Sequence, residues 1–337
     1  MQHCCVSAQD SEIGPRSVWI VTDGRSGNLN PARALARALQ AHGWEAAQER
    51  TALPKPWAAR LPAGVWAALG AREGGWPFTG LADRGAGLAR PWPGLAIGAG
   101  RRAAPAVAAL RRLGGVRAVQ ILDPGLDSER FDLVVVPSHD RLRGGNVLTT
   151  LGSLSAVTPA SARAAAAVWP RPAGLPEGPL AAVLLGGPSR SARFGAAERR
   201  AVVAAVSALA TRFGVLVTPS RRTPAGLAAA VAEGAPGAWV WDGTGPNPYP
   251  AILGVAEVAL VTADSANMVC EAASAGLPVL VTGVDGVSGK LRRLHDDLSA
   301  GGFTRDFKGM AEVWPAPGLD EAGRIGAEVA RRLADGA

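Results

Sequence analysis

The sequence predicts an α/β fold made of two similar halves, each with a parallel sheet between helices. Short apolar, β-rich runs alternate with helical patterns along the chain, which is typical of a doubly wound sheet. The pattern pauses at a proline- and glycine-rich linker, residues 170–179, and then starts again. Several apolar runs end in glycine-rich turns, and ligands of such folds bind at the carboxyl ends of the strands.

The first half begins with an apolar run at residues 18–22, a polar turn, and a helical pattern at residues 32–41. Asn30 suits the N-cap of that helix and Pro31 its first turn. The remaining apolar runs and helical patterns of this half predict three strands and two helices: strands at residues 95–98, 116–122 and 133–136, and helices at residues 104–113 and 158–168.

The second half repeats the scheme. It predicts strands at residues 181–185, 215–218, 239–241, 258–262 and 278–282, and helices at residues 196–213, 266–275, 289–299 and 320–333. We therefore expect a disordered tail at residues 1–16, an N-terminal domain at residues 17–172 and a C-terminal domain at residues 173–337. The last helix is free to pack back on the N-terminal domain.

Composition narrows the class of protein. The chain has 337 residues, 48% of them apolar, and a net charge of +7 that comes mainly from paired arginines. The basic residues form no long run and no aromatic stripe accompanies them, which disfavours a nucleic-acid partner. Three cysteines make no disulfide framework, and no stretch has the length of a signal or membrane-spanning segment. We expect a cytoplasmic protein, with a peripheral position on the inner face of the cytoplasmic membrane left open.

The most informative segment is residues 261–279. Asp264 or Ser265 is placed to cap a helix whose first amides would bind an anion. Asn267, Met268 and Glu271 share one face of that helix. A carboxylate at this place can accept both hydroxyls of a ribose while the helix start holds a diphosphate. An ordinary buried helix with a glutamate at its edge is the alternative.

Two further turns carry chemistry. Gly186 and Gly187 directly follow a buried strand and allow a phosphate or sugar close to the backbone, with Ser189 and Arg190 as added donors. The opening turn begins at Asp23 and lacks both the G-x-G-x-x-G spacing and the later acidic residue, so an NAD site is disfavoured.

The order of these motifs resembles that of glycosyltransferase-B enzymes, two Rossmann-like domains facing across a cleft. It is distantly similar to the peptidoglycan lipid-linked N-acetylglucosaminyltransferase. More closely, the chain resembles the bacterial relatives of the plant mitochondrial-fission ELM family, over about residues 17 to 310. The shared motifs are Asp23-Gly24-Arg25-x-Gly27-Asn28, Gly100-Arg101-Arg102, Pro137-Ser138-His139-Asp140, Gly144-x-Asn146-Val147, Ser220-Arg221-Arg222-Thr223-Pro224, Asn247-Pro248-Tyr249 and Thr262-x-Asp264-Ser265-x-Asn267-Met268-x-x-Glu271-Ala272.

This resemblance implies sugar transfer from a nucleoside diphosphate sugar, expected to be UDP-linked, without a resident cofactor. Glu271 matches the ribose-binding glutamate, Asn267 and Met268 the helix start that holds the diphosphate. The matching glycine-rich donor loop comprises Gly186, Gly187 and Ser189. We expect Ser265, Arg221 and Lys290 to stabilise the leaving diphosphate. The sequence contains no Asp-x-Asp motif, so no metal is required.

The acceptor side departs from the transferase pattern. Its loop is Gly24, Arg25, Gly27 and Asn28, and Asn28 stands where the peptidoglycan enzyme has a histidine. Asparagine cannot take a proton at pH 7, so Asp23 and His139 become the candidate bases.

The acceptor itself is predicted from a tryptophan-rich region. Trp57, Arg60 and Trp66 would form a surface patch of the protein that docks on anionic lipid. Such a patch favours a lipid-linked or lipopolysaccharide acceptor of the cell envelope. Packing inside the domain is the alternative for these residues. For the whole chain, two other functions stay open: a membrane-associated adaptor that kept only the fold, and a nucleotide-sugar epimerase.

Overall fold

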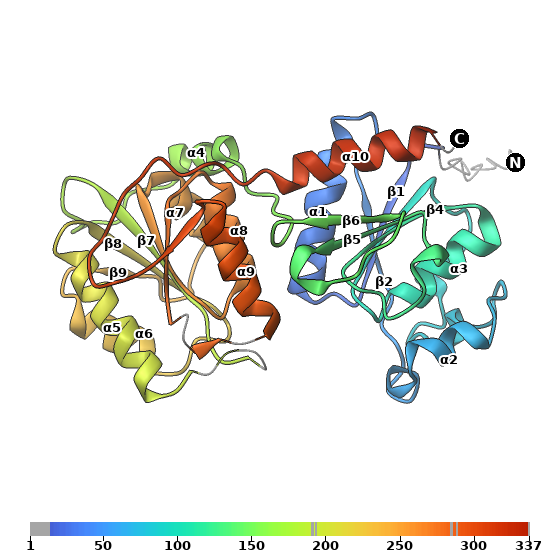
Figure 1. Ribbon diagram of the computed structural model, residues 1–337, viewed down its shortest axis with the longest axis horizontal. Coiled ribbons are helices and arrows are strands. Elements are labelled where there is room, and N and C mark those ends of the chain that lie inside the picture. Colours follow the sequence, from blue (N-terminus) through green and yellow to red (C-terminus); the bar gives the residue numbers. More distant parts are fainter. Residues whose placement is uncertain (1–13, 190–191, 193, 284–285, 288, 336–337) are drawn as a thin grey trace, which may run out of the picture. The chain divides into compact units, whose positions relative to one another are not determined.

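The computed structural model describes residues 14–189, 192, 194–283, 286–287 and 289–335. These form two compact units (Figure 1). Of the described residues, unit 1 comprises those within 14–136, 143–148 and 326–335, and unit 2 those within 137–142 and 149–325. The units thus exchange chain segments: the short stretch 137–142 and the expected linker region belong to unit 2, and the end of the last helix belongs to unit 1. The boundary at residues 172 and 173 expected from the linker is therefore not where this division falls.

The sheet of unit 1 has six strands in the order β2-β1-β3-β4-β5-β6. The pairings from β2 through β5 are parallel. The strands are β1 (Val18–Thr22), β2 (Gln48–Thr51), β3 (Leu95–Ala99), β4 (Arg117–Ile121), β5 (Leu133–Pro137) and β6 (Val147–Thr150). The helices packed with them are α1 (Ser26–Gln40), α2 (Ala63–Ala68), α3 (Ala104–Gly114) and the greater part of α10 (Glu321–Asp335).

The sheet of unit 2 also has six strands, in the order β12-β11-β10-β7-β8-β9, all paired in parallel. The strands are β7 (Leu180–Leu185), β8 (Gly214–Pro219), β9 (Trp239–Val240), β10 (Val258–Thr262), β11 (Val279–Thr282) and β12 (Thr304–Asp306). The helices are α4 (Pro159–Val168), α5 (Ala196–Ala210), α6 (Leu227–Gly234), α7 (Tyr249–Val255), α8 (Ala266–Ser274) and α9 (Gly289–Ala300).

Successive side chains of the central strands of unit 2 point to opposite faces of the sheet, and an apolar layer covers each face. Ala182 and Leu184 of β7 point to the layer formed with α4, α7, α8 and α9. Val183 and Leu185 point to the layer formed with α5 and α6. Because helices cover both faces, the central strands are continuously apolar, and apolar and polar residues do not alternate along them. These continuous apolar runs are the sequence pattern that predicted the strands. The two-faced α/β fold expected from the sequence is confirmed.

Each sheet reverses its strand order at one place. In unit 1, the chain passes from β1 outward to β2, and from β3 in the other direction to β4, so the switch point lies between β1 and β3. In unit 2, the same argument places it between β7 and β10. Ligands of doubly wound sheets bind outside the carboxyl ends of the strands at such a point.

One helix starts earlier than the sequence indicated. We expected a helix at residues 32–41 with Asn30 as its cap, but α1 begins at Ser26 and contains Pro31 in its interior. Proline removes one backbone hydrogen bond there. The helix tolerates the loss because Pro31, Leu35 and Leu39 are buried on one face. The polar turn after β1 therefore includes the first turn of a helix.

The tryptophan patch predicted from the sequence does not form as expected, because one of its two tryptophans is buried. Trp66 is buried and donates its indole N–H to the Ala58 carbonyl oxygen, 3.0 Å away, so it belongs to the packing of unit 1 and not to a surface patch. Trp57 is 54% exposed. Large apolar side chains from the same region are exposed with it, namely Leu53, Val65 and Leu69. Among the described helices, none is long and apolar enough to cross a membrane.

Candidate functional sites at the two switch points

The switch point of unit 1 is built around the Asp23 carboxylate. Its side chain is only 2% exposed. Oδ1 accepts a hydrogen bond from the Asn28 amide at 2.8 Å. Oδ2 lies 3.5 Å from the Arg25 guanidinium and 3.6 Å from that of Arg102. The structure thus gathers Asp23, Arg25 and Asn28 as predicted and adds Arg102 from the turn after β3. A carboxylate with so many donors suits orientation of the loop better than removal of a proton.

Two glycines make this arrangement fit. Gly24 has φ +78°, and its amide donates to the Thr22 hydroxyl at 2.8 Å. Gly100 has φ +78°, and a Cβ there would lie 2.6 Å from the Asn28 amide nitrogen. A side chain at position 100 would therefore displace Asn28 from Asp23. Gly27 lies in the first turn of α1, where a Cβ would meet nothing within 4 Å.

At the switch point of unit 2, the glycine turn after β7 meets the turn after β10. The Gly186 amide donates to the Thr262 hydroxyl at 2.7 Å, and the Gly187 amide donates to Asp264 Oδ2 at 2.8 Å. A Cβ on Gly186 would lie 2.3 Å from both Asp264 oxygens. A Cβ on Gly187 would lie 1.8 Å from the Arg222 carbonyl oxygen. Both glycines are therefore needed for close approach of neighbouring turns.

Arg222, which the sequence analysis did not single out, completes this contact. Its guanidinium lies 3.0 Å from Asp264 Oδ2, and it donates to the Gly187 carbonyl oxygen at 3.0 Å. The predicted Arg221 precedes it and is exposed in the same turn. Asp264 Oδ1 is buried and has no hydrogen-bond partner among the described residues. The order Ser-Arg-Arg after β8 contained the signal, but sequence alone could not tell which arginine contacts Asp264.

The start of α8 is left uncapped by side chains. Ser265 is its N-cap residue, yet neither Ser265 nor Asp264 forms the side-chain cap that we expected, because Asp264 is engaged with Gly187 and Arg222. The first intrahelical bond is from the Val269 amide to the Ser265 carbonyl oxygen, at 3.2 Å. The amides before Val269 consequently have no partner within the helix. Such a helix start binds anions well.

Glu271 lies one turn further along α8. It is half-buried, as are Asn267 and Met268 on the same side of the helix. Tyr249, the first residue of α7, donates its hydroxyl to Glu271 Oε2 at 2.7 Å. Burial raises the pKa of Glu271, and the Tyr249 hydrogen bond opposes that rise. Burial, followed by the negative charge of Glu271, holds the pKa of Tyr249 well above its ordinary value. Tyr249 thus fixes one carboxylate oxygen and leaves the other for a ligand.

The remaining glycine-loop residues are less informative. Ser189 is exposed, and its backbone pairs with Ala192 in both directions, at 3.1 and 3.4 Å. Arg190 lies outside the described residues. The predicted donor loop is therefore described at Gly186, Gly187 and Ser189 only.

His139 and Lys290 lie together in unit 2, on the contact between residues 138–140 and α9. Lys290 Nζ donates to Asp140 Oδ1 at 2.6 Å, and the Arg293 guanidinium donates to the His139 carbonyl oxygen at 3.1 Å. Ser138 donates to Asp297 at 2.7 Å. Burial lowers the pKa of His139, although Asp140 opposes that change. The imidazole is therefore neutral at pH 7, as a proton acceptor must be, whereas the charge of Lys290 is already matched by Asp140.

A second histidine, His295, contacts the turn after β10 at the switch point of unit 2. His295 of α9 is 3% exposed, and its Nε2 lies 2.7 Å from the carbonyl oxygen of Ala263 in the turn after β10. A carbonyl only accepts, so Nε2 carries the proton. Burial lowers the pKa of His295. No sequence pattern indicated His295, since it lies in the middle of an ordinary amphipathic helix. Within the described residues, no group of three His, Cys, Asp or Glu side chains is arranged to hold a metal ion.

Known structures share this fold. The UDP-GlcNAc 2-epimerase from Neisseria meningitidis, solved with UDP-GlcNAc bound, superposes with a TM-score of 0.55 at 12% identity, over 95% of this chain and 100% of that one. The glycosyltransferase of kitacinnamycin superposes with a TM-score of 0.53 at 17% identity, over 95% and 93% of the two chains. At these identities the likeness establishes the glycosyltransferase-B type of fold alone.

The sequence comparisons are more specific. The mitochondrial fission protein ELM1 of Arabidopsis thaliana is 31% identical over 275 residues, which are 72% of this chain and 64% of that protein. The chain thus spans less than two thirds of the length of this relative. The profile of the family described as mitochondrial fission ELM1 matches residues 26–333. The predicted resemblance is confirmed, and the chain belongs to the mitochondrial fission ELM1 family.

Proposed function

We propose that unit 2 binds a nucleoside diphosphate sugar and that the protein is a glycosyltransferase. The observation that carries the proposal is the pairing of an uncapped start of α8 with Glu271 one turn later, at the switch point of a parallel sheet. The helix amides suit a diphosphate. The Glu271 oxygen that Tyr249 does not bind suits the ribose hydroxyls. The superposed epimerase was solved with UDP-GlcNAc, which favours a UDP-linked sugar as the first donor to test.

In the proposed reaction, an acceptor hydroxyl oxygen forms a bond to the anomeric carbon of the sugar. The bond from that carbon to the phosphate oxygen breaks, and the nucleoside diphosphate leaves with the bonding electrons. The start of α8 stabilises the negative charge that develops on the diphosphate. Arg221, the residue before Arg222, adds a positive charge to this stabilisation. Lys290 contributes less than the sequence suggested, because Asp140 neutralises it.

His139 is the better candidate for the base that takes the proton of the acceptor. Its lowered pKa keeps the imidazole neutral, and its Nε2 lies 4.0 Å from Asp140 Oδ1, too far for a hydrogen bond that would occupy this nitrogen. Asp23 is ion-paired with Arg25 and Arg102 and bonded to Asn28. We assign Asp23 the role of positioning the loop of Gly24, Arg25, Gly27 and Asn28 on the acceptor side.

The acceptor is proposed to be a lipid-linked or lipopolysaccharide molecule of the cell envelope. The support is a group of large apolar side chains from one region of the sequence of unit 1 that are exposed, namely Leu53, Trp57, Val65 and Leu69. Apolar side chains of this size, with basic residues near them in sequence, favour a position on the inner face of the cytoplasmic membrane. Trp66 is buried and does not belong to this group.

Release of nucleoside diphosphate from labelled UDP-sugars tests the proposal. The protein is incubated with UDP-GlcNAc and other UDP-sugars, with and without a lipid extract, beside His139→Asn and a surface control, Asp296→Asn. Transfer to lipid, or slow release to water, that His139→Asn reduces at least tenfold while the control does not supports a transferase. Conversion of the sugar without release of UDP would instead identify an epimerase.

An adaptor remains the second candidate, favoured by the naming of the Arabidopsis relative as a fission protein. An adaptor has no need of a nucleotide site. Absence of both turnover and nucleotide binding would therefore favour it over the enzyme.

A further inference from the structure

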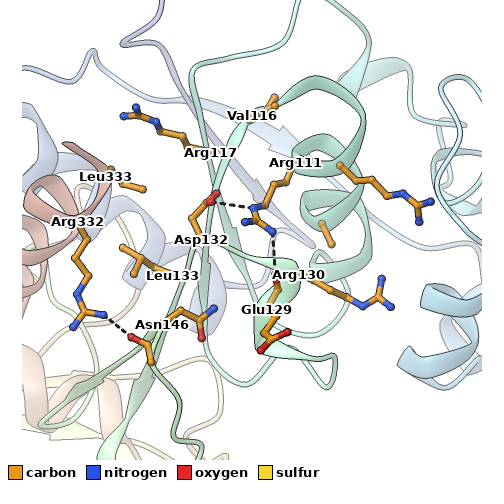
Figure 2. Close-up of a pocket in the computed structure, with 14 residues that line it drawn as sticks. Arg111, Val116, Arg117, Glu129, Arg130, Asp132, Leu133, Asn146, Arg332 and Leu333 are labelled. Carbon is orange, nitrogen blue, oxygen red and sulfur yellow. Dashed lines mark hydrogen bonds and ion pairs between the residues drawn. The ribbon is translucent and has the colours of Figure 1, made fainter. Parts of the chain in front are cut away.

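Basic side chains line a cavity of about 950 Å³ in unit 1 that neither switch point uses (Figure 2). Arg117 and Arg130 belong to this lining, and Figure 2 shows their guanidinium groups pointing to opposite sides of it. One anion binds several donors only where they converge, so this cavity lacks the arrangement of an anion site. A guanidinium and a helix start do come together at the switch point of unit 2, around Arg222.

Arg222 belongs to a turn, residues 220–223, that directly follows β8. The Ser220 hydroxyl accepts a hydrogen bond from the Arg222 amide at 3.2 Å, and the Thr223 hydroxyl accepts one from the Ser220 amide at 2.8 Å. Thr223 also donates its hydroxyl to the Leu185 carbonyl oxygen, at the end of β7, at 2.8 Å. Both hydroxyls thus bind backbone groups and fasten the turn to the neighbouring strand. The backbone that carries Arg222 is consequently held in place before any ligand binds.

The guanidinium of Arg222 is itself fixed by two neighbouring turns. Nη2 lies 3.0 Å from Asp264 Oδ2, and Nη1 donates to the Gly187 carbonyl oxygen at 3.0 Å and to that of Pro188 at 3.5 Å. The Arg222 side chain nevertheless remains 44% exposed. A guanidinium has five N–H donors, so these contacts leave donors for a ligand. Arg222 therefore combines a fixed position with hydrogen-bonding capacity that the protein does not use.

This guanidinium lies beside the start of α8. Its partner Asp264 directly precedes Ser265, the N-cap residue of that helix. A cation near a helix start opposes the helix macrodipole, and the one carboxylate of Asp264 balances the charge of Arg222 only. The partial positive charge of the helix start remains uncompensated, because the first turn of α8, all of it described, contains no acidic residue. An anion bound between the guanidinium and the helix amides would compensate it.

A diphosphate suits this place because of its charge and its oxygens. Guanidinium groups bind phosphate oxygens through paired, charge-assisted hydrogen bonds. In the proposed transfer, negative charge on the departing diphosphate increases as its bond to the sugar breaks. A donor that the protein already holds in position stabilises that charge without first reorganising.

We propose that Arg222 binds the diphosphate of the nucleotide sugar, as a second contact beside the amides at the start of α8. This inference rests on the proposed function, because it names a further residue of the same donor site. Asp264 orients the guanidinium from the opposite side and does not contact the ligand. Gly187 lets the turn of Arg222 approach, since a Cβ on Gly187 would lie 1.8 Å from the Arg222 carbonyl oxygen.

Calorimetric titration of the full chain with UDP, GDP and ADP, each at low and at high salt, tests the assignment. The variant is Arg222→Gln, and Arg163→Gln is the matched control, since Arg163 is exposed on α4. Arg222→Lys is a second variant, which keeps a charge for Asp264 but lacks the planar fork of donors. Hydrogen exchange of the β7 and β10 amides verifies that unit 2 of each variant is folded.

At low salt, we expect Arg222→Gln to bind the recognised nucleotide at least about tenfold more weakly than the control, the loss expected for a hydrogen bond to a charged group. Arg222→Lys should lie between the two. High salt should reduce the difference, because it screens the contact of a half-exposed guanidinium with a phosphate. A purely structural role would weaken binding equally at both salt concentrations.

The outcomes separate this assignment from the proposed function. If Arg222→Gln binds the nucleotide as the control does, or if its loss of affinity is the same at low and high salt, Arg222 does not bind the diphosphate and the nucleotide site itself stands. If the unaltered protein binds none of the three nucleotides, the assignment and the proposed function are both overturned.

Discussion

Replacement of Asp264 by alanine should destabilise unit 2 far more than a typical substitution of an aspartate. The Asp264 side chain is 2% exposed and joins two turns, through the Gly187 amide at 2.8 Å and the Arg222 guanidinium at 3.0 Å. A hydrogen bond to a charged group contributes about 1.5–3 kcal/mol, and the amide left behind is buried. Arg222 is 44% exposed, so its ion pair adds at most about 1 kcal/mol. The expected loss is about 2–4 kcal/mol.

Hydrogen exchange of the β7 and β10 amides, followed against urea concentration, reports the unfolding free energy of unit 2 by itself. Asp264→Asn keeps an oxygen for the Gly187 amide and should recover about half of the loss. Asp296→Ala is the control, since Asp296 is exposed on α9, and it should change the unfolding free energy by less than about 0.5 kcal/mol. A loss for Asp264→Ala no larger than that of the control would refute the assigned contacts.

For three other substitutions in unit 2, the direction of the change in folding stability follows from the structure. Burial raises the pKa of Glu271, so its ionised form costs folding free energy once the pH exceeds the folded pKa; Glu271→Gln should raise the Tm at pH 7, and a lower Tm would contradict this burial. Burial lowers the pKa of His295, so the unfolded chain binds the proton more readily, and stability should fall as the pH drops below about 6.5; His295→Gln should flatten that dependence in pH-resolved melts. Gly152 has φ +89° and a Cβ there would lie 2.5 Å from the Cys270 sulfur, so Gly152→Ala should cost about 2–4 kcal/mol in urea unfolding, against about 1–2 kcal/mol for Gly174→Ala, where φ is +82° and a Cβ meets nothing; equal losses would contradict the close contact.

The central strands were predictable because burial on both faces leaves an unbroken apolar run. The polar strands at the sheet edges were not: β2 reads Gln-Glu-Arg-Thr and β12 reads Thr-Arg-Asp, whereas the apolar edge strand β9 was predicted, at residues 239–241. Edge strands have one neighbour and are largely exposed, so polar side chains suit them and the apolar signal disappears. The helix α1 was placed six residues late for a related reason. Its first turn is polar and exposed at the switch point, and Pro31 imitates a helix start.

The candidate sites were predicted at the level of turns and not of contacts. Glycine turns after buried strands indicated the turns at both switch points, because ligand sites of doubly wound sheets lie at the carboxyl ends of the strands. Which side chains meet there depends on tertiary packing. Arg222 and Tyr249 are the clearest examples, since both belong to motifs shared with the family, yet only the structure brings them to Asp264 and Glu271.

The central claim, a nucleoside diphosphate site on unit 2, is tested most directly by calorimetric titration with UDP, GDP, ADP and CMP. Glu271→Ala is the variant and Asp296→Ala the control. We predict that one nucleotide, with UDP the first expectation, binds the unaltered protein and the control, and that Glu271→Ala weakens binding at least tenfold, the loss expected for a charged hydrogen-bond acceptor. If none of the four binds at millimolar concentration, or if Glu271→Ala binds as the control does, the site assigned to α8 is not a nucleotide site.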